Sequence, residues 1–375
     1  MKEGWTYKKL GDIAIIIHGK NQKDVISENG QYPIYGSGGN VMGYATDYLC
    51  EANTTILGRK GSINNPQFIT ERFWNVDTAF GIFAKNGNDS KFIYYFIKSI
   101  DWSKKNTGTT LPSLTQQIVK SVELSVPPLA EQERIVERLD AAFAQIDELK
   151  SNAEKQLAEA RALFQSALTQ AMQPKPGWQE KTLKEITTKI GSGATPKGGK
   201  AVYIENGVAL VRSMNVHNGF FKYENLAHIR DEAANLLNGV ELKQNDVLFN
   251  ITGASIARCC VVPDDVLPAR VNQHVAIIRP KADIVEPRFL SYVLISKTHQ
   301  NVLLSIGLSG ATRQALTKKD LENHIVSLPT NHKQKEILDI LDNLSLKVRE
   351  LEEINRKTAA ECDAMKQALL RQIFE

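Results

Sequence analysis

Two stretches of this sequence share one design: residues 126–149 read VPPLAEQERIVERLDAAFAQIDEL, and residues 328–351 read LPTNHKQKEILDILDNLSLKVREL. Each contains a Pro (Pro127, Pro329) that is followed by a Gln (Gln132, Gln334) and then by apolar residues in alternating steps of four and three. This spacing predicts a long amphipathic helix with a coiled-coil seam. Residues 130–172 contain neither Gly nor Pro, so the first helix is predicted to span about 43 residues, or about 65 Å.

The two predicted seams have the same length and the same register relative to their Gln. The first is predicted to comprise Ile135, Leu139, Ala142, Ile146, Leu149, Ala153, Gln156, Ala160, Leu163 and Ala167. The second is predicted to comprise Ile337, Leu341, Leu344, Val348, Leu351, Asn355, Thr358, Cys362, Met365 and Leu369. Packing the seams on each other would bury both at once. The alternative is that each helix packs separately on its own globule.

The segments that precede the helices are also repeated. Gly4-Trp5 recurs as Gly177-Trp178, and similar matches extend to the ends of the helices, with an offset that grows from 173 to 202 residues. The second copy therefore carries about 29 extra residues. We predict four parts: a first globule over 1–128, a helix over 129–173, a second globule over 174–328 and a helix over 329–375.

The globules are predicted to be α+β and rich in strands, because short apolar runs alternate with Gly, Asn and Ser turns. The predicted strands are residues 54–57, 79–84, 208–212, 246–251 and 274–279. Near the end of each globule, residues 92–97 and 288–295 have the composition of a helix. The fold is therefore expected to be two tandem strand-rich domains, each followed by a long helix.

The composition is that of a folded protein: 42% of the 375 residues are hydrophobic and 23% are charged. No run of eighteen apolar residues occurs and the first ten residues are polar, so we expect a cytoplasmic protein without a membrane span. The four cysteines lack a C-x-x-C spacing and are interpreted as buried free thiols. The net charge of +4 alone says little about partners.

The distribution of charge is more informative than its sum. Residues 1–128 hold 14 Lys and Arg against 11 Asp and Glu, and residues 177–328 hold 18 against 14. The two helical segments hold 6 against 8 and 8 against 9. Slightly basic globules separated by slightly acidic helices favour globules that face DNA and helices that face protein.

A search for catalytic motifs finds no convincing one. Residues 65–68 (NPQF) resemble a methyltransferase motif but lack its second Pro, and residues 191–199 (GSGATPKGG) lack the Gly-Lys-Ser/Thr ending of a P-loop. No pair of histidines has the spacing of a metal site, and no carboxylate cluster indicates a nuclease. We therefore predict no catalytic centre, no metal and no cofactor in this chain.

Basic residues beside Gly, Asn and Ser in loops are the candidates for DNA contact, because Gly permits close approach and Arg can donate two hydrogen bonds to guanine. The best cluster is Arg59-Lys60 within residues 58–65, and its counterpart in the second globule is residues 252–258. For each single residue, a solvated surface charge is the alternative. The predicted DNA-binding residues are Arg59, Lys60, Asn64, Lys104, Lys105, Lys197, Arg212, Ser255, Arg258 and Arg313.

The order of globule, helix, globule and helix resembles the specificity subunits of Type I restriction-modification enzymes. The resemblance rests on the Trp-x4-Leu-x2-Ile openings at Trp5 and Trp178, on the Pro and Gln at the head of each heptad helix, and on the helix endings at Ala167-Leu168 and at residues 368–374. It covers essentially the whole chain.

The resemblance implies two target recognition domains, each reading half of a split DNA site, and an antiparallel helix pair that sets the spacing. It further implies partners: double-stranded DNA, two modification subunits and, through the complex, restriction subunits. S-adenosylmethionine, ATP and Mg would then be bound by those partners. Two alternatives remain at this point: a stand-alone methyltransferase or nuclease, and a scaffold whose globules bind proteins.

Overall fold

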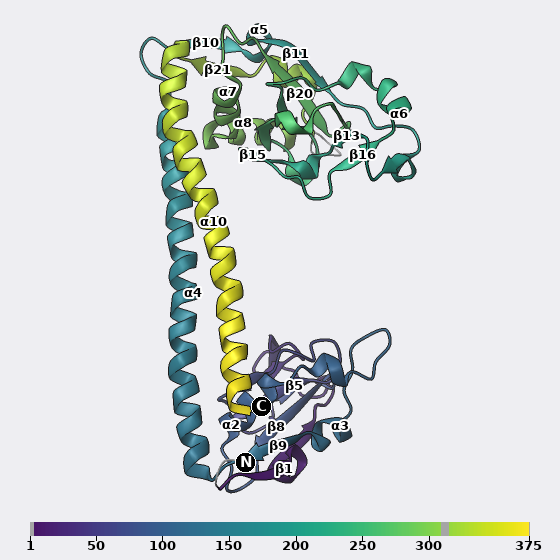
Figure 1. Cartoon of the computed structure of the whole chain (residues 1–375), viewed down its shortest axis with the longest axis vertical. Coiled ribbons are helices and arrows are strands. Elements are labelled where there is room, and N and C mark those ends of the chain that lie inside the picture. Colours follow the sequence, from purple (N-terminus) through teal and green to yellow (C-terminus); the bar gives the residue numbers. More distant parts are fainter. Residues whose placement is uncertain (1–3, 309–314, 375) are drawn as a thin grey trace. The chain divides into compact units, whose positions relative to one another are not determined.

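The computed structural model describes residues 4–308 and 315–374, which form two compact units (Figure 1). Unit 1 comprises residues 4–155 and 354–374, and unit 2 comprises residues 156–308 and 315–353. Each unit contains one strand-rich globule and a segment of each of two long helices, α4 (Leu129–Ala171) and α10 (Asn331–Phe374). The predicted α+β fold and both predicted long helices are confirmed.

The globule of unit 1 is built on two sheets. The antiparallel four-stranded sheet has the order β2 (Ala14–His18), β8 (Ala79–Ala84), β5 (Thr54–Gly58) and β6 (Gln67–Ile69). The second sheet has the order β4 (Val41–Ala45), β3 (Tyr32–Tyr35) and β7 (Trp74–Asn75), with β3 and β7 parallel. A separate pair, β1 (Thr6–Lys9) and β9 (Glu123–Val126), joins the two ends of the globule.

The globule of unit 2 repeats this topology with additions. Its four-stranded antiparallel sheet has the order β11 (Thr187–Ser192), β20 (Val275–Pro280), β17 (Val247–Asn250) and β18 (Cys259–Val261). The second sheet contains β12 (Tyr203–Ile204), β16 (Ala227–Ile229), β13 (Val208–Val211) and β19 (Ala269–Val271), with β13 and β19 parallel. The end-joining pair is β10 (Gln179–Thr182) and β21 (Ile325–Leu328). The five strands predicted above correspond to β5, β8, β13, β17 and β20.

The extra residues of unit 2 are placed partly in one connection. Residues 36–40 join β3 to β4, whereas residues 212–226 join the equivalent strands β13 and β16. The longer connection contains the hairpin of β14 (Val216–His217) and β15 (Phe220–Phe221).

Short helices complete both globules. The predicted helices near the globule ends are α2 (Ser90–Ser99) and α7 (Pro287–Ile295). Helix α8 (Lys297–Leu308) was not predicted, although its sequence has an ordinary helical composition. The remaining helices are α1 (Leu10–Ile13), α3 (Gln116–Ser121), α5 (Leu183–Ile186), α6 (Asp231–Asn235) and α9 (Lys318–Glu322).

The repeated Gln fixes the start of each long helix to its globule. The side chain of Gln132 is buried, accepts a hydrogen bond from the Asp89 N–H at 2.9 Å and donates one to the Pro127 carbonyl at 2.9 Å. Gln334 does the same with the Glu286 N–H at 2.9 Å and the Pro329 carbonyl at 3.0 Å. The repeated Pro and Gln are therefore a structural motif that joins α4 to the start of α2 and α10 to the start of α7.

Each globule core is completed by both long helices. In unit 1, Ile135, Leu139 and Phe143 from the start of α4 share one hydrophobic cluster with Leu370 from the end of α10. In unit 2, Leu341 from the start of α10 shares a cluster with Leu168 and Met172 from the end of α4 and just beyond it. Each globule therefore packs on the start of its own helix and on the end of the other one.

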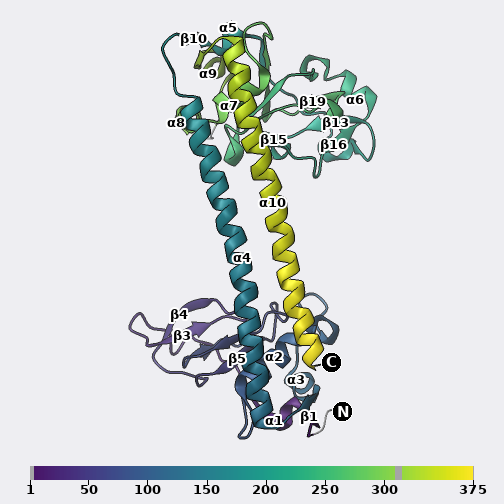
Figure 2. The same cartoon turned by 60° about the vertical axis from the view of Figure 1, so that its left-hand side comes forward.

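Within each unit the two helical segments run antiparallel (Figure 2). In unit 1, the Lys366 ammonium lies 2.5 Å from the Asp147 carboxylate, and Lys150 lies 3.6 Å from Asp363. In unit 2, Arg161 pairs with Glu352 at 2.6 Å. These contacts confirm an antiparallel helix pair and overturn the alternative of two separate helices.

Four predicted seam residues are wrong: Leu149, Leu163 and Met365 are 52%, 61% and 50% exposed, and Gln156 is exposed as well. After Ile146 the less exposed positions of α4 are Lys150, Ala153, Leu157, Ala160 and Phe164, so the step of four precedes the step of three. The sequence favoured the wrong register at Leu149, because the neighbouring Lys150 is charged, and it could not separate Leu163 from the equally apolar Phe164. Among the other predicted contacts, Ile135, Leu139, Ile146, Ile337 and Leu341 are buried, and Leu344, Val348, Leu351 and Leu369 are half-buried.

Candidate nucleic-acid interface

The loop that follows β5 is held rigidly in unit 1. A side chain at Gly58 would meet the Ser62 carbonyl oxygen at 2.3 Å, and Gly61 has a φ of +80°, so both positions require glycine. A β-bridge joins Lys60 to Ser113, and the Gly61 N–H donates to the Pro112 carbonyl at 2.9 Å. Residues 58–65 are therefore presented on a fixed backbone.

The predicted residues of this loop have different environments. Arg59 is half-buried and donates from Nη1 to the Asp77 carbonyl at 2.9 Å, which leaves other guanidinium donors available. Lys60 is exposed. The Asn64 amide is occupied, because its oxygen accepts from the Trp102 N–H at 2.6 Å and its nitrogen donates to Asp101 at 3.4 Å. Asn64 thus holds the following basic turn in place.

That turn is the 3-10 helix Trp102–Lys105, which is anchored by the buried Trp102 ring. Lys104 and Lys105 at its end are exposed. Beside it lies a hollow of about 370 Å³ lined by Gly61, Ser62, Ile63, Asn64, Asn65, Ser103, Asn106 and Pro112. A second hollow of about 670 Å³ includes Asn64, Lys98, Lys104, Lys105 and Arg371 in its lining. The structure therefore brings the basic turn next to the loop that carries Arg59 and Lys60.

The equivalent loop of unit 2 is braced in the same way. A β-bridge joins Thr252 to Ala315, Gly253 has a φ of +73°, and the Leu316 N–H donates to the Ile251 carbonyl at 2.8 Å. Beside the loop lies a hollow of about 410 Å³ that Ser255 and Arg258 line together with Ser213, Met214, Thr252, Gly253, Ala254 and His274. The two predicted residues of this loop are thus brought together.

The other predicted residues of unit 2 lie elsewhere. Arg212 is half-buried, donates from Nη2 to the Asn225 carbonyl and lies over the Tyr203 ring at 5.6 Å, while its buried Nε makes no hydrogen bond, so the guanidinium points into the fold. Lys197 is exposed and lies outside the hollow that Ser255 and Arg258 line. Arg313 lies outside the described residues.

Several residues of these surfaces were not predicted from the sequence. His274 lines the unit 2 hollow, and its Nδ1 is 2.6 Å from the Thr252 hydroxyl. Lys98 and Arg371 line the larger hollow of unit 1. His274 lies within residues 271–275, which correspond to residues 76–80 in the duplication, so its position in the repeat could have identified it. Lys98 and Arg371 come from helices that gave no such signal.

No metal centre is found within residues 4–308 and 315–374, because no three His, Cys, Asp or Glu side chains gather there. No helix in that part of the chain is long and apolar enough to cross a membrane. All four cysteines are free and buried, as predicted. Burial raises the pKa of Cys50 and of Cys260 to about 12, which keeps both as unreactive thiols.

Two globules with equivalent glycine-containing loops, joined by an antiparallel helix pair, define a class of tandem-domain proteins with a helical spacer. A family model described as Type I restriction modification DNA specificity domain matches residues 2–159 and 175–361. The EcoBI specificity subunit of Escherichia coli is 25% identical over 353 residues, which cover 85% of this chain and 72% of that protein. The MjaVIII specificity subunit of Methanocaldococcus jannaschii is 23% identical over 383 residues, which cover 94% of this chain and 90% of that protein.

Solved structures show the same fold. A chain from a study of complex assembly and conformational transition of the type I R-M system has a TM-score of 0.75 at 20% identity, covering 99% of this chain and 98% of that one. The HsdS subunit from Thermoanaerobacter tengcongensis has a TM-score of 0.53 at 19% identity, covering 100% of this chain and 97% of that one. The chain belongs to the family of Type I restriction-modification DNA specificity subunits. It is thus a specificity component and not the catalytic subunit of such a system.

Proposed function

We propose that this chain reads a bipartite DNA site, one half with each globule, while the helix pair sets the distance between the half-sites. The observation that carries this proposal is the equivalence of the two loops. Each follows the same strand of the four-stranded sheet and is braced by the same kind of bridge, at Lys60 to Ser113 and at Thr252 to Ala315. Two braced loops with basic side chains are suited to two similar DNA segments.

In the first globule, Arg59 reads a base and Lys60 binds a phosphate, because Arg has a planar fork of donors whereas Lys is a point charge. Lys104 and Lys105 contact the backbone beside them. In the second globule, Arg258 reads a base with Ser255 next to it. Lys197 and Arg313 contribute backbone contacts, and Arg212 and Asn64 support the loops.

The helices dock two modification subunits, and restriction subunits join through that complex. Support comes from apolar side chains that α4 and α10 leave exposed, since such side chains favour a protein-facing surface. They include Leu149, Leu163, Ile340, Leu346, Ile354 and Met365, which are between 48% and 63% exposed. S-adenosylmethionine, ATP and Mg are then bound by those partners, and the complex acts in the cytoplasm.

Mapping of methylated adenines in a host that expresses this chain with its modification subunits tests the proposal. A split motif with a gap of fixed length is expected, and it should vanish when this chain is omitted. Methylation that persists without this chain would contradict the proposal. If the globules bind proteins instead of DNA, the complex should show no salt-dependent DNA affinity. If the chain is not itself a methyltransferase, the purified chain alone should not methylate DNA.

A further inference from the structure

The hairpin β14–β15 gives unit 2 an aromatic surface beside its basic loop. Phe220 is 41% exposed and Tyr223 is 51% exposed. The His217 ring stacks on Phe220 with ring centroids 4.9 Å apart and an interplanar angle of 16°. Phe220 is thus held in a fixed orientation at the surface.

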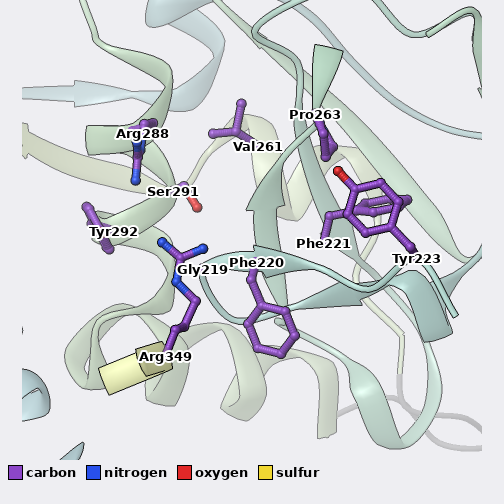
Figure 3. Close-up of a pocket in the computed structure, with 10 residues that line it drawn as sticks. All are labelled: Gly219, Phe220, Phe221, Tyr223, Val261, Pro263, Arg288, Ser291, Tyr292 and Arg349. Carbon is purple, nitrogen blue, oxygen red and sulfur yellow. The ribbon is translucent and has the colours of Figure 1, made fainter. Parts of the chain in front are cut away.

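These aromatic residues form one wall of a pocket of about 360 Å³, and two arginines lie opposite (Figure 3). Arg288 comes from α7 and Arg349 from α10. Arg288 pairs with Asp342 at 2.8 Å, and that carboxylate also accepts a hydrogen bond from Tyr292. Within the described residues Arg349 makes no ion pair, so the pocket keeps an unbalanced positive charge.

The fold alone does not require this charge. In unit 1 the residues at the equivalent places are Lys91, which pairs with Asp140 at 2.7 Å, and Asp147, which pairs with Lys366 at 2.5 Å. The α4 position that corresponds to Arg349 is therefore acidic and neutralised. Among the described residues, unit 1 therefore has neither a counterpart of Arg349 nor an equivalent of the β14–β15 hairpin at this place.

The His217 ring links this pocket to the hollow beside the proposed base-reading loop of unit 2. Met214 lines the hollow that Ser255 and Arg258 share, and the His217 ring contacts the Met214 carbonyl at 3.2 Å. The same His217 ring stacks on Phe220, which lines the pocket that contains Arg288 and Arg349. A duplex that contacts residues 252–258 and also covers the hairpin would reach the pocket that Phe220 and Arg349 line.

We propose that this arginine pocket, lined by Phe220, Tyr223, Arg288 and Arg349, binds a backbone phosphate of duplex DNA beside the half-site of unit 2. The inference rests on the proposed function. The guanidinium of Arg349 supplies paired donors to the phosphate oxygens, and Phe220 packs against the adjoining sugar. Such a contact positions the duplex without reading its sequence. The link to the loop through His217 favours DNA over an acidic segment of a partner protein.

The test uses the full chain in complex with its modification subunits and measures DNA affinity by fluorescence anisotropy from 50 to 200 mM salt. Two duplexes are compared, one with the mapped site and one without it. Arg349→Ala should lower the magnitude of the salt slope by about 0.9, so that its loss of affinity is about three-fold larger at 50 mM than at 200 mM salt. The loss should be equal on both duplexes. Phe220→Ala should weaken binding with the parent salt slope.

Lys347→Ala is the matched control, because it removes the same charge from α10 at a side chain that already pairs with Glu350 at 2.9 Å. It should leave the slope unchanged. A parent slope for Arg349→Ala would overturn the inference, and so would a loss confined to the mapped site. Weaker capture of modification subunits at an unchanged slope would assign the pocket to a protein partner and also overturn it. If the parent complex itself shows no site preference, the proposed function fails instead.

Discussion

The two units share the contacts that hold their helices and differ in the surfaces beside their loops. Gln132 and Gln334 make matching hydrogen bonds, and the Tyr95 and Tyr292 hydroxyls donate to the equivalent carboxylates Asp140 and Asp342. In contrast, the β14–β15 hairpin is found in unit 2 and has no equivalent in the described part of unit 1. The duplication therefore keeps the framework that positions the helices and varies the surface that we propose contacts DNA.

The largest effect is expected where both helices complete a core. Leu370 is fully buried in the core of unit 1 and Leu168 is 1% exposed in the core of unit 2, so either truncation to Ala should cost about 2–5 kcal/mol of unfolding free energy. Hydrogen exchange read by mass spectrometry should show lost protection in unit 1 for Leu370→Ala and in unit 2 for Leu168→Ala.

Leu163→Ala is the control, because this side chain is mostly exposed and the change should stay within about 0.5 kcal/mol. A large loss of unfolding free energy for Leu163→Ala, with a small loss for Leu168→Ala, would support the seam register first predicted from the sequence. Because the end of α10 completes the core of unit 1, a related globule that replaces residues 1–128 must still pack on the end of α10.

A smaller effect is expected at the repeated Gln. Gln132→Ala leaves the Asp89 N–H without its acceptor, and Gln334→Ala does the same to the Glu286 N–H. Each unsatisfied buried group should cost about 1–3 kcal/mol, measured by urea denaturation. Because the two sites match, their costs should be similar; a negligible cost at one would show that the two anchors are not equivalent.

The sequence predicted most of the framework. The spacing of apolar residues and the absence of Gly and Pro located α4 and α10 to within a residue or two, and the duplication revealed the matching globules. The seam register failed after Ile146, because Leu149 and Lys150 are adjacent and only packing decides which faces inward. The pairing of each globule with the end of the other helix was also hidden, since it depends on contacts between residues far apart in sequence.

The site was less predictable. The glycines of the two loops are explained by the backbone, because a side chain at Gly58 would clash with the Ser62 carbonyl and because Gly61 and Gly253 have positive φ. The role of each polar residue could not be predicted, because the Asn64 amide makes its hydrogen bonds within the fold and Arg212 donates from Nη2 to the Asn225 carbonyl. Whether a loop side chain faces solvent depends on neighbours such as Trp102 and Asn225 that sequence spacing does not place.

The loops should differ from the helix anchors in affecting specificity and not stability. Arg59→Ala, in the complex with modification subunits, should lose about 1–3 kcal/mol of discrimination at one position of the half-site that unit 1 reads. Arg258→Ala should do so in the other half-site. Lys60→Ala should weaken binding equally on all sequences and lower the magnitude of the salt slope by about 1. Methylation sequencing and anisotropy would measure these changes.

Relaxed specificity in both half-sites from Arg59→Ala alone would show that the units read DNA jointly. If Arg59→Ala and Lys60→Ala both bind and methylate DNA like the parent across salt concentrations, this loop does not contact DNA. The basic turn of Lys104 and Lys105 would then be the next surface to test in unit 1.

The smallest predicted difference concerns pH. In unit 2 the His299 Nδ1 lies 2.9 Å from the His324 Nε2, and burial lowers the pKa of both rings, that of His324 to about 4. One nitrogen must donate and the other must accept, so a proton on the acceptor breaks the contact. Unit 1 has a single histidine within its sequence, His18, and cannot form such a pair.

Between the ordinary histidine pKa of 6.5 and the lowered value of about 4, the unfolded chain binds more protons than the folded one. The stability of unit 2 should therefore be full above pH 6.5 and fall as the pH drops, by about 1–2 kcal/mol between pH 7 and pH 5. Hydrogen exchange at both pH values should show the loss in unit 2 beyond any loss in unit 1. His324→Gln, which cannot be protonated, should remove the excess loss; an equal pH response of the variant and the parent would assign the effect to other groups.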